Sequence, residues 1–409
     1  VRISFPSVPY KVKQQLVCCF FSLQRVLTSR SDFASFTMPR PLTFGIEFEF
    51  AFATIPYGFS PPGSEKTNNL PLAMRSHLTS SQAQALLHEA FDAINKVLDN
   101  FGLRTELSSR STHVSLCSHN TTHWHLTNDA TIEGPNLDYQ WLQIELISPV
   151  LQLTPTGIAE AMQVAGLIKR HFRVSTNDTT GLHVHVGDSS RGFPLGVCQK
   201  VMGFFYTFDE LLAPLHPRSR EDHSWALNIR DAFQLPILNS WSVSEALEAI
   251  FDTNTIEELE FGFGGRRPAV NLKNLGNGGT PGKKTIEFRQ HAGTLEPERV
   301  QAWIQTVGGI VDWCRRATDT EYEELVEDSA EQMDQGDAYA PGTAVELLKA
   351  VELKEPAKFY GKRLKKNNGK EPEGELITYG KPLSDDVVDS SSDSSEGGVH
   401  SGDEEMVDA

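Results

Sequence analysis

Three short segments of the chain place ionisable side chains at every second position: Glu47-Phe48-Glu49, His183-Val184-His185 and Glu287-Phe288-Arg289-Gln290-His291. Because alternate residues of a β-strand point to the same face, each segment would present charged groups on one side and apolar groups on the other. Carboxylates two residues apart in a strand lie about 6 to 7 Å apart at Cβ, which suits two hard cations, or a cation and a phosphate. Mg²⁺ and Mn²⁺ take carboxylate and phosphate oxygens and tolerate imidazole. The three segments together therefore predict a site for such cations.

Each segment taken alone has an ordinary explanation. The glutamate pair would be a solvated strand face, and Glu287 with Arg289 would be a surface ion pair. The histidine pair resembles a metal-binding strand of cupins, but Asp188 stands near the place where cupins have a glutamate. Gly181 and Gly187 bracket the histidines and predict close backbone approach. Because all three segments carry apolar residues on the opposite face, a shared site is favoured over coincidence.

The strands that must hold these groups follow from the alternation of apolar and polar residues, and the helices from apolar positions at helical spacing. Strands are expected at 42–52, 123–126, 142–147, 181–187, 269–275 and 284–291, helices at 80–98, 157–172, 196–212, 297–318 and 344–352, and a loop at 214–220. These elements alternate without a regular βαβ rhythm, and the strands are polar on one face. Both features favour an α+β fold with an antiparallel sheet.

The charge of the chain argues against nucleic acid as a partner. The 409 residues carry a formal net charge of −17 at pH 7. Nine acidic groups and no Lys or Arg lie between Ser384 and Ala409, so the remainder has 37 basic against 45 acidic groups. Binding to phosphates along a nucleic acid needs a basic face, and that remainder shows no run of Lys or Arg with interleaved aromatic residues.

The cysteines indicate the redox state of the cellular compartment in which the protein functions. They are Cys18, Cys19, Cys117, Cys198 and Cys314. Because they are odd in number and scattered, a reducing compartment fits better than a disulfide framework or a zinc site. No apolar run approaches the roughly 20 residues that span a bilayer, so no membrane partner is expected. We expect a cytoplasmic protein, or a mitochondrial one if residues 1–37 are a genuine targeting sequence.

The segments that flank residues 38–320, the expected catalytic domain, differ from it in composition. Residues 1–37 are basic and contain serines, so they are a mitochondrial-type presequence or upstream sequence translated in error before Met38, and we favour the second. Residues 321–383 form an acidic extension, in which we expect one short helix and a solvated turn at the basic patch 362–366. Residues 384–409 have almost nothing apolar to bury and should be disordered.

The order of the motifs resembles that of the amidoligase family, which is common in fungi. The motifs span 45–49, 144–149, 181–187 and 285–294, with Trp124, Asp129 and Asn271-Leu272 between them. The resemblance covers Met38 to about Thr318 and places the chain in a branch of the carboxylate-amine ligase superfamily. It implies a curved antiparallel sheet of the glutamine-synthetase type, lined with metal-binding carboxylates and flanked by helices.

The resemblance also implies a reaction. Such an enzyme uses ATP to phosphorylate a carboxylate, and an amine then attacks the acyl phosphate to form an amide or isopeptide bond. Its cofactors would be ATP and Mg²⁺ or Mn²⁺, and its substrates a small-molecule or peptide carboxylate and an amine. The metal ligands implied by the resemblance are Glu47, Glu49, Glu145, His183 and Glu287.

Other residues receive catalytic roles. By the same resemblance, Arg289 would contact the transferred phosphoryl group and His185 would face the substrate. Asp129 is a candidate to bind or deprotonate the incoming ammonium, although an Asx-turn is an equally good explanation of it. His291 would support Glu287 or Arg289. The candidates for triphosphate contacts are Lys283, Arg267, Arg218, Arg220, Arg266 and Lys284.

Three functions remain open on the sequence: an ATP-dependent amide-forming ligase, a metal-dependent hydrolase or cupin-like enzyme, and a binding protein that kept the fold without catalysis. The second would use His183, His185 and Glu287 without a nucleotide. Arg289 favours the ligase, because an arginine aimed at a metal site makes sense when phosphate is present. The oligomeric state is left open.

Overall fold

The computed structural model describes residues 40–56, 74–76, 83–105, 122–135, 139–221, 223–233, 242–263, 267–279, 282–336 and 341–372. All of them except Arg40 belong to one compact unit, residues 41–409. The segment 1–37, the acidic tail 384–409 and Arg266 lie outside the described residues. Within the described ranges, no helix combines the length and the apolar character needed to cross a bilayer.

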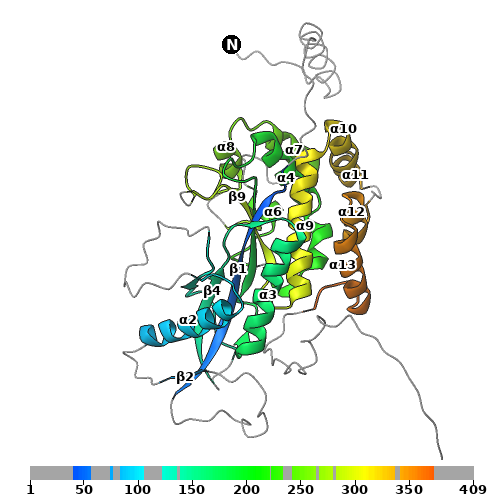
Figure 1. Ribbon diagram of the computed structural model, residues 1–409. Coiled ribbons are helices and arrows are strands. Elements are labelled where there is room, and N and C mark those ends of the chain that lie inside the picture. The colour runs from blue at the N-terminus through cyan, green and yellow to red at the C-terminus, as the bar shows by residue number, and fades with distance from the viewer. Residues whose placement is uncertain are drawn as a thin grey trace, which may run out of the picture. The chain divides into compact units, whose positions relative to one another are not determined.

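A sheet centred on β1 (Thr43–Pro56) organises the described residues (Figure 1). Its strands follow the order β3-β4-β1-β7-β9-β8, each antiparallel to its neighbours. Their bounds are His125–Asn128 for β3, Gln140–Ile147 for β4, Gly181–Gly187 for β7, Thr285–Ala292 for β9 and Val270–Asn271 for β8. Short strands also pair with β1: β2 (Met74–Ser76) is parallel to it, and β5 (Leu151–Gln152) and β6 (Val174–Ser175) are antiparallel. Helices combined with this sheet confirm the α+β prediction.

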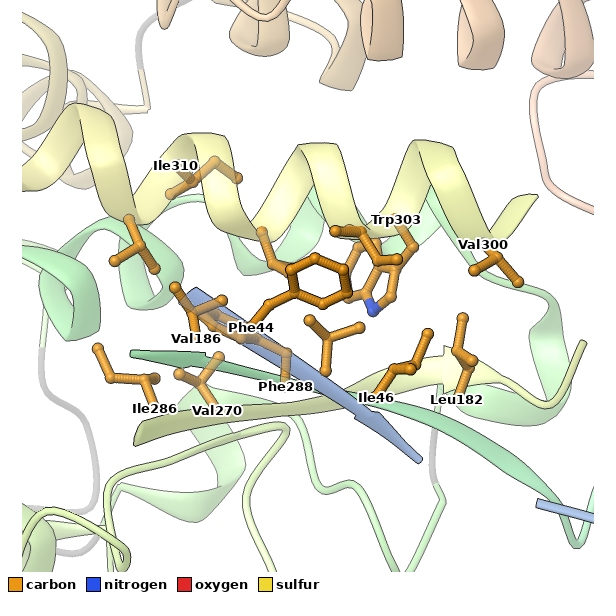
Figure 2. Packing of buried hydrophobic residues seen from close by; sticks show 14 of the residues in the cluster. Phe44, Ile46, Leu182, Val186, Val270, Ile286, Phe288, Val300, Trp303 and Ile310 are labelled. Carbon is orange, nitrogen blue, oxygen red and sulfur yellow. The ribbon is translucent and has the colours of Figure 1, made fainter. Parts of the chain in front are cut away.

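One face of the sheet is covered by α9 (Pro297–Arg316), which packs against α3 (Pro155–His171). Figure 2 shows apolar side chains of the sheet beneath α9, with Trp303 directed down into them. Every second residue of β1 points into this core and is at most 1% exposed: Phe44, Ile46, Phe48, Phe50 and Phe52. The intervening positions, which carry the charged residues, therefore face the other side of the sheet.

Further helices complete the described chain. They are α2 (Ala83–Asn100), α4 (Leu195–Thr207), α5 (Asp209–Leu212), η3 (Ala213–Leu215), η4 (Arg218–Arg220), α6 (Ile229–Ala232), α7 (Val243–Phe251), α8 (Ile256–Gly262), α10 (Asp319–Tyr322) and η5 (Glu323–Glu327). The helix expected at 196–212 is thus divided between α4 and α5. The loop expected at 214–220 contains two short helical turns, and the strand expected at 269–275 is reduced to β8.

The prediction of one short helix in residues 321–383 was wrong. The structure has α11 (Asp328–Gln335), α12 (Ala344–Ala350) and α13 (Lys354–Lys366) there. The basic patch 362–366 is the last turn of α13 rather than a solvated turn, because Ala357 and Tyr360 place an apolar stripe at helical spacing and bury it in the main core. These helices belong to the same hydrophobic core as the sheet.

The pairing of β7 with β9 contains a β-bulge. Leu182 pairs with His291 and Val184 pairs with Phe288, so one residue of β7 lies opposite Arg289 and Gln290 of β9. A bulge resets the alternation of side chains along its strand. His291 therefore shares the core face with Leu182, where its ring centroid lies 5.4 Å from that of Trp303 and 5.8 Å from that of His216. The prediction that His291 supports Glu287 or Arg289 was wrong.

Acid is expected to destabilise the fold through these two buried histidines. Burial lowers the pKa of His291 to about 3 and that of His216 well below its ordinary value, and nearby charges add to both shifts. Those charges are Arg220, Arg299, Arg363 and Lys370. The unfolded chain takes up a proton on each imidazole near pH 6.5, and the native state does not. Each histidine should lower the free energy of unfolding by about 1.4 kcal/mol per pH unit as the pH falls from 6.5 toward 3.

Replacing His216 with leucine tests this expectation by urea denaturation at several pH values. Neither ring nitrogen of His216 has a hydrogen-bond partner among the described residues, so the substitution removes a titrating group without breaking a bond seen there. We expect the acid side of the stability profile to become shallower by about 1.4 kcal/mol per pH unit. An unchanged slope would mean that other groups cause the acid sensitivity.

Phe288 should dominate the stability of the sheet's core. Its side chain is 0% exposed and its ring centroid lies 5.2 Å from that of Phe205. Truncating a buried phenylalanine to alanine removes buried apolar surface and leaves a cavity. Phe288→Ala should therefore lower the free energy of unfolding, measured by urea denaturation, by about 3–5 kcal/mol. Phe261→Ala is the matched control, because Phe261 is 79% exposed and its truncation should change the stability little. Equal losses in the two variants would contradict the packing described here.

Candidate metal and phosphate site

Strand register brings the predicted metal ligands together on the face opposite α9. Glu47 of β1 pairs with His183 of β7, and Glu49 pairs with Glu145 of β4. His185 of β7 pairs with Glu287 of β9. Because directly opposite residues of antiparallel strands share a face, all of these side chains converge on one place.

Glu47 lies at the centre of this cluster. Its Oε1 lies 2.9 Å from His185 Nε2 and 3.2 Å from Lys283 Nζ, and its Oε2 lies 3.2 Å from His183 Nδ1. Glu47, His183, His185 and Glu287 are each no more than 7% exposed, so the cluster is shielded from bulk water. Electrostatic interactions in such a setting are stronger than on an open surface.

The described residues contain two groups that could each hold a metal ion. One is Glu47, His185 and Glu287, and the other is Glu47, Glu145 and His183, each with ligand atoms within 4.8 Å of one another. Glu47 belongs to both, so two cations would share it. Carboxylate oxygens with one imidazole form a donor set that suits Mg²⁺ or Mn²⁺.

The charges of the cluster also fit a cation. Burial raises the pKa of Glu145 well above its ordinary value, and the nearby Glu47, Glu49 and Asp129 raise it further. Burial acts in the same direction on Glu47, but the neighbouring His185, His183 and Lys283 bring its pKa well below the ordinary range. A divalent cation would offset the carboxylate repulsion that raises the pKa of Glu145.

Glu49 lies beside these two groups and belongs to neither. Its Oε2 accepts a hydrogen bond of 2.7 Å from the backbone N–H of Gly181, and its Oε1 lies 3.4 Å from His183 Nε2. In this arrangement Glu49 orients His183. A Cβ on Gly181 would lie only 2.6 Å from His183 Nε2, which explains the glycine predicted to allow close approach.

Two cationic side chains adjoin the carboxylates. Arg289 Nη1 forms an ion pair with Glu287 Oε1, and Lys283 Nζ reaches Glu47. Burial would raise the pKa of Glu287, but the charges of Arg289 and His185 bring it below its ordinary value. Cations beside metal-binding carboxylates provide a place for an anionic group such as phosphate.

Arg267 lies at the rim of the site rather than among the carboxylates. Its guanidinium lies 3.7 Å from the ring centroid of Trp225, and the carbonyl of Trp225 accepts a 3.1 Å hydrogen bond from Arg289 Nε. Arg267 is thus linked to Arg289 through one residue. Of the other basic candidates, Lys284 donates to the carbonyl of Leu275 and Arg218 is exposed.

Asp129 forms the Asx-turn that the sequence left open. Its Oδ1 accepts hydrogen bonds of 2.8 Å from the backbone N–H and the hydroxyl of Thr131. Its Oδ2 has no hydrogen-bond partner among the described residues. Because Asp129 also raises the pKa of Glu145, it lies close enough to act on the cluster electrostatically.

Two residues of the quoted motifs were given no role by the sequence reasoning, and the structure shows them supporting candidate metal ligands. Asn271 Nδ2 donates to Glu287 Oε2 at 2.9 Å, and Thr285 Oγ1 lies 3.2 Å from His185 Nδ1. Each fixes the orientation of a candidate metal ligand. Thr285 stands two residues before Glu287, so the alternation of β9 carried a signal for it. Asn271 lies on another strand, and only the pairing of β8 with β9 reveals its role.

Two solved structures are similar to this chain at low identity. The bifunctional glutathione synthetase from Pasteurella multocida shares 13% identity, with 80% of this chain and 48% of that chain covered and a TM-score of 0.31. The ligase PafA, solved in complex with the prokaryotic ubiquitin-like protein Pup, shares 10% identity, with 81% of this chain and 66% of that chain covered and a TM-score of 0.31. The chain therefore spans about half the length of the first and just under two thirds of the second. At these TM-scores the likenesses carry no argument about this site.

The family comparison is more informative. No curated protein matches the chain. A family described as "Putative amidoligase enzyme" matches residues 40–311, which contain every predicted site residue from Glu47 to Arg289. The chain belongs to this amidoligase family.

Proposed function

We propose that this protein is an ATP-dependent ligase that joins a carboxylate to an amine through an acyl phosphate. The observation that carries the proposal is the pair of overlapping carboxylate and imidazole groups around Glu47, placed directly beside Arg289 and Lys283. Metal ligands and phosphate-binding cations in one buried cluster are what phosphoryl transfer requires, because its catalysis depends mainly on positioning and electrostatics.

Each residue of the cluster has a part in this proposal. Glu47, Glu145 and His183 would hold one Mg²⁺ or Mn²⁺, and Glu47, His185 and Glu287 the other. Divalent cations held by these residues would supply positive charge that offsets the negative charge of the phosphate. Arg289, held by Glu287 and by the carbonyl of Trp225, would donate to the transferred phosphoryl group.

The amine must lose a proton before it attacks the acyl phosphate. We propose that Asp129 binds the ammonium through Oδ2, while its Oδ1 stays in the Asx-turn. Asp129 raises the pKa of Glu145, so it lies near this proposed metal ligand. The amine subsite at Asp129 would therefore adjoin the metal that Glu145 would hold.

The same contacts bear on the competing functions. A cupin-like enzyme or a simple metal-dependent hydrolase would use the two histidines and Glu287, and it would not need the basic side chains of Arg289 and Lys283 beside them. Arg289 and Lys283 instead favour a substrate that carries phosphate. A binding protein without catalysis would keep the metal site and fail to release ADP.

Calorimetric titration of the full chain with ATP, with and without Mg²⁺, tests the proposal. We expect binding that depends on Mg²⁺ and is abolished by Glu287→Ala, followed by ADP release with a suitable pair of a small-molecule or peptide carboxylate and an amine. Folded protein that binds no ATP with either Mg²⁺ or Mn²⁺ would exclude the ligase.

A further inference from the structure

Arg220 lies next to the site and is buried, and its guanidinium is bonded mainly to main-chain carbonyls. Its side chain is 5% exposed. Its guanidinium donates to main-chain carbonyls: Nη2 to Arg289 at 2.7 Å, Nε to Gln290 at 3.2 Å and Nη1 to Thr180 at 3.5 Å. Nη1 also lies 3.4 Å from His223 Nδ1. Among the described residues it forms no ion pair with a carboxylate. Burying a guanidinium is costly unless its donors are satisfied, so main-chain carbonyls take that role here.

Two of the three carbonyls that Arg220 binds belong to the bulge, and the third, that of Thr180, also accepts from the backbone N–H of Gly293. Arg289 and Gln290 are the two residues of β9 that oppose a single residue of β7, and Thr180 directly precedes β7. A bulge leaves main-chain groups outside the regular ladder, and buried carbonyls need donors from elsewhere. Arg220 supplies those donors at the bulge. There the Arg289 side chain lies on the face of the metal cluster and that of His291 on the core face.

The segment that carries Arg220 is held in turn by residues 370–371 near the end of the described chain. Lys370 forms an ion pair with Glu221, the neighbour of Arg220. The backbone N–H of Glu371 donates to the carbonyl of Pro214 at 2.9 Å. Residues 370–371, which we call the C-terminal arm, therefore tie both ends of the segment 214–221.

The arm is itself anchored in the core. The Glu371 side chain is 4% exposed and accepts hydrogen bonds from Arg299 Nη2 of α9 at 2.6 Å and from Arg363 Nε of α13 at 2.7 Å. A carboxylate bound by two arginines is a strong, geometrically defined contact. The arm and α13 lie beyond residues 40–311, the part that matches the amidoligase family.

We propose that Arg220 is a positioning residue for Arg289 and Glu287, and that the C-terminal arm holds Arg220 in place from outside the family's matched region. Arg220 stabilises the bulge, and the bulge keeps Glu287 and Arg289 on the face of the metal cluster. A slip of one residue in a strand moves its side chains to the opposite face, so a weakened bulge would misplace both. The effect on ligand binding rests on the proposed function, whereas the effect on the bulge does not.

Hydrogen exchange of the full chain, followed by mass spectrometry over 285–292, tests the structural part. Arg220→Gln should speed exchange there by roughly tenfold or more, because losing the contacts lowers the local opening free energy by an amount similar to one hydrogen bond to a charged group. Arg220→Lys keeps the charge but not the planar fork, so it should show a smaller increase. Glu371→Gln should produce the same pattern more weakly.

Mn²⁺ titration of the same variants tests the consequence for the site. Arg220→Gln should weaken Mn²⁺ binding about 10-fold or more, in the range seen when an outer-shell partner is lost. Arg230→Gln is the matched control, since Arg230 also donates to two carbonyls, those of Tyr206 and Thr207, at 2.9 and 2.8 Å. It should lower stability without changing Mn²⁺ affinity.

The possible results separate this proposal from the proposed function. Unchanged exchange over 285–292 in folded Arg220→Gln would overturn the role of Arg220, as would equal losses of Mn²⁺ affinity in the Arg220 and Arg230 variants. If Arg220→Gln does not fold, Arg220→Lys and Glu371→Gln carry the same comparison. Wild-type protein that binds no Mn²⁺ would contradict the proposed function, and the exchange measurement would still decide the role of Arg220.

Discussion

Replacing Glu47 with glutamine is expected to weaken Mn²⁺ binding by more than about 100-fold, the upper end of the loss that follows removal of an outer-shell partner. Glu47 is the residue common to both candidate ligand groups, so its substitution removes a charged oxygen from each. Glutamine has nearly the same shape and keeps one carbonyl oxygen. The variant should therefore fold, but it should be less stable than the wild type without metal, because His185, His183 and Lys283 stabilise the charged carboxylate of Glu47.

The measurement is Mn²⁺ titration of the full chain by calorimetry or electron paramagnetic resonance, with thermal unfolding in a chelator as the test of folding. Glu248→Gln is the matched control, because Glu248 is exposed on α7 away from the cluster. It should bind Mn²⁺ as the wild type does. Equal affinities of the Glu47 and Glu248 variants would place the metal site elsewhere.

Replacing Arg289 with methionine is expected to weaken Mg²⁺-dependent ATP binding by roughly 10- to 150-fold, the equivalent of one hydrogen bond to a charged group. Among the described residues, Arg289 contacts the cluster through Glu287, and it belongs to neither of the two candidate ligand groups found there. Mn²⁺ affinity should therefore stay near the wild-type value while ATP affinity falls. This division distinguishes a phosphate contact from a metal ligand.

Titration of Arg289→Met with Mn²⁺ alone, and then with ATP at saturating Mg²⁺, measures the two affinities separately. Arg191→Met serves as the control, because the Arg191 side chain is 69% exposed and only 3.9 Å from its partner Asp188 at the nearest atoms. It should change neither affinity. A parallel loss of Mn²⁺ and ATP binding in Arg289→Met would show that Arg289 supports the ligand geometry rather than the phosphate.

The local sequence determined the strands that hold the site. In β1, every second residue from Phe44 to Phe52 is apolar and lies in the core, whereas Glu47 and Glu49 lie on the other face. This follows from position alone, because successive side chains of a strand point to opposite faces. The same argument located His183 and His185. These are properties of a single segment, so one sequence was sufficient to predict them, and the α+β class followed from the order of such segments.

Contacts between segments were decided by the tertiary structure. The alternation of residues in β9 predicted that His291 lies on the same face as Glu287 and Arg289. The bulge at Arg289 and Gln290 places it instead in the core beside Trp303. A bulge depends on the partner strand and on the donors that satisfy its carbonyls, here those of Arg220, and neither is encoded in the spacing of β9. Arg220 was predicted as a possible phosphate contact, and the structure gives it main-chain partners instead.

Tertiary packing also decided how far toward the C-terminus the chain joins the main hydrophobic core. The sequence of residues 321–383 is acidic and predicted only one short helix, yet Tyr360 is buried in the main core and Glu371 binds Arg299 of α9. Such contacts join residues far apart along the chain, and their free energy exists only once both partners are brought together. The sequence by itself therefore predicted which residues could bind metal ions and phosphate and which face of a strand holds them. Only the tertiary structure decided which of them meet, because register, bulges and long-range ion pairs are properties of assembled segments.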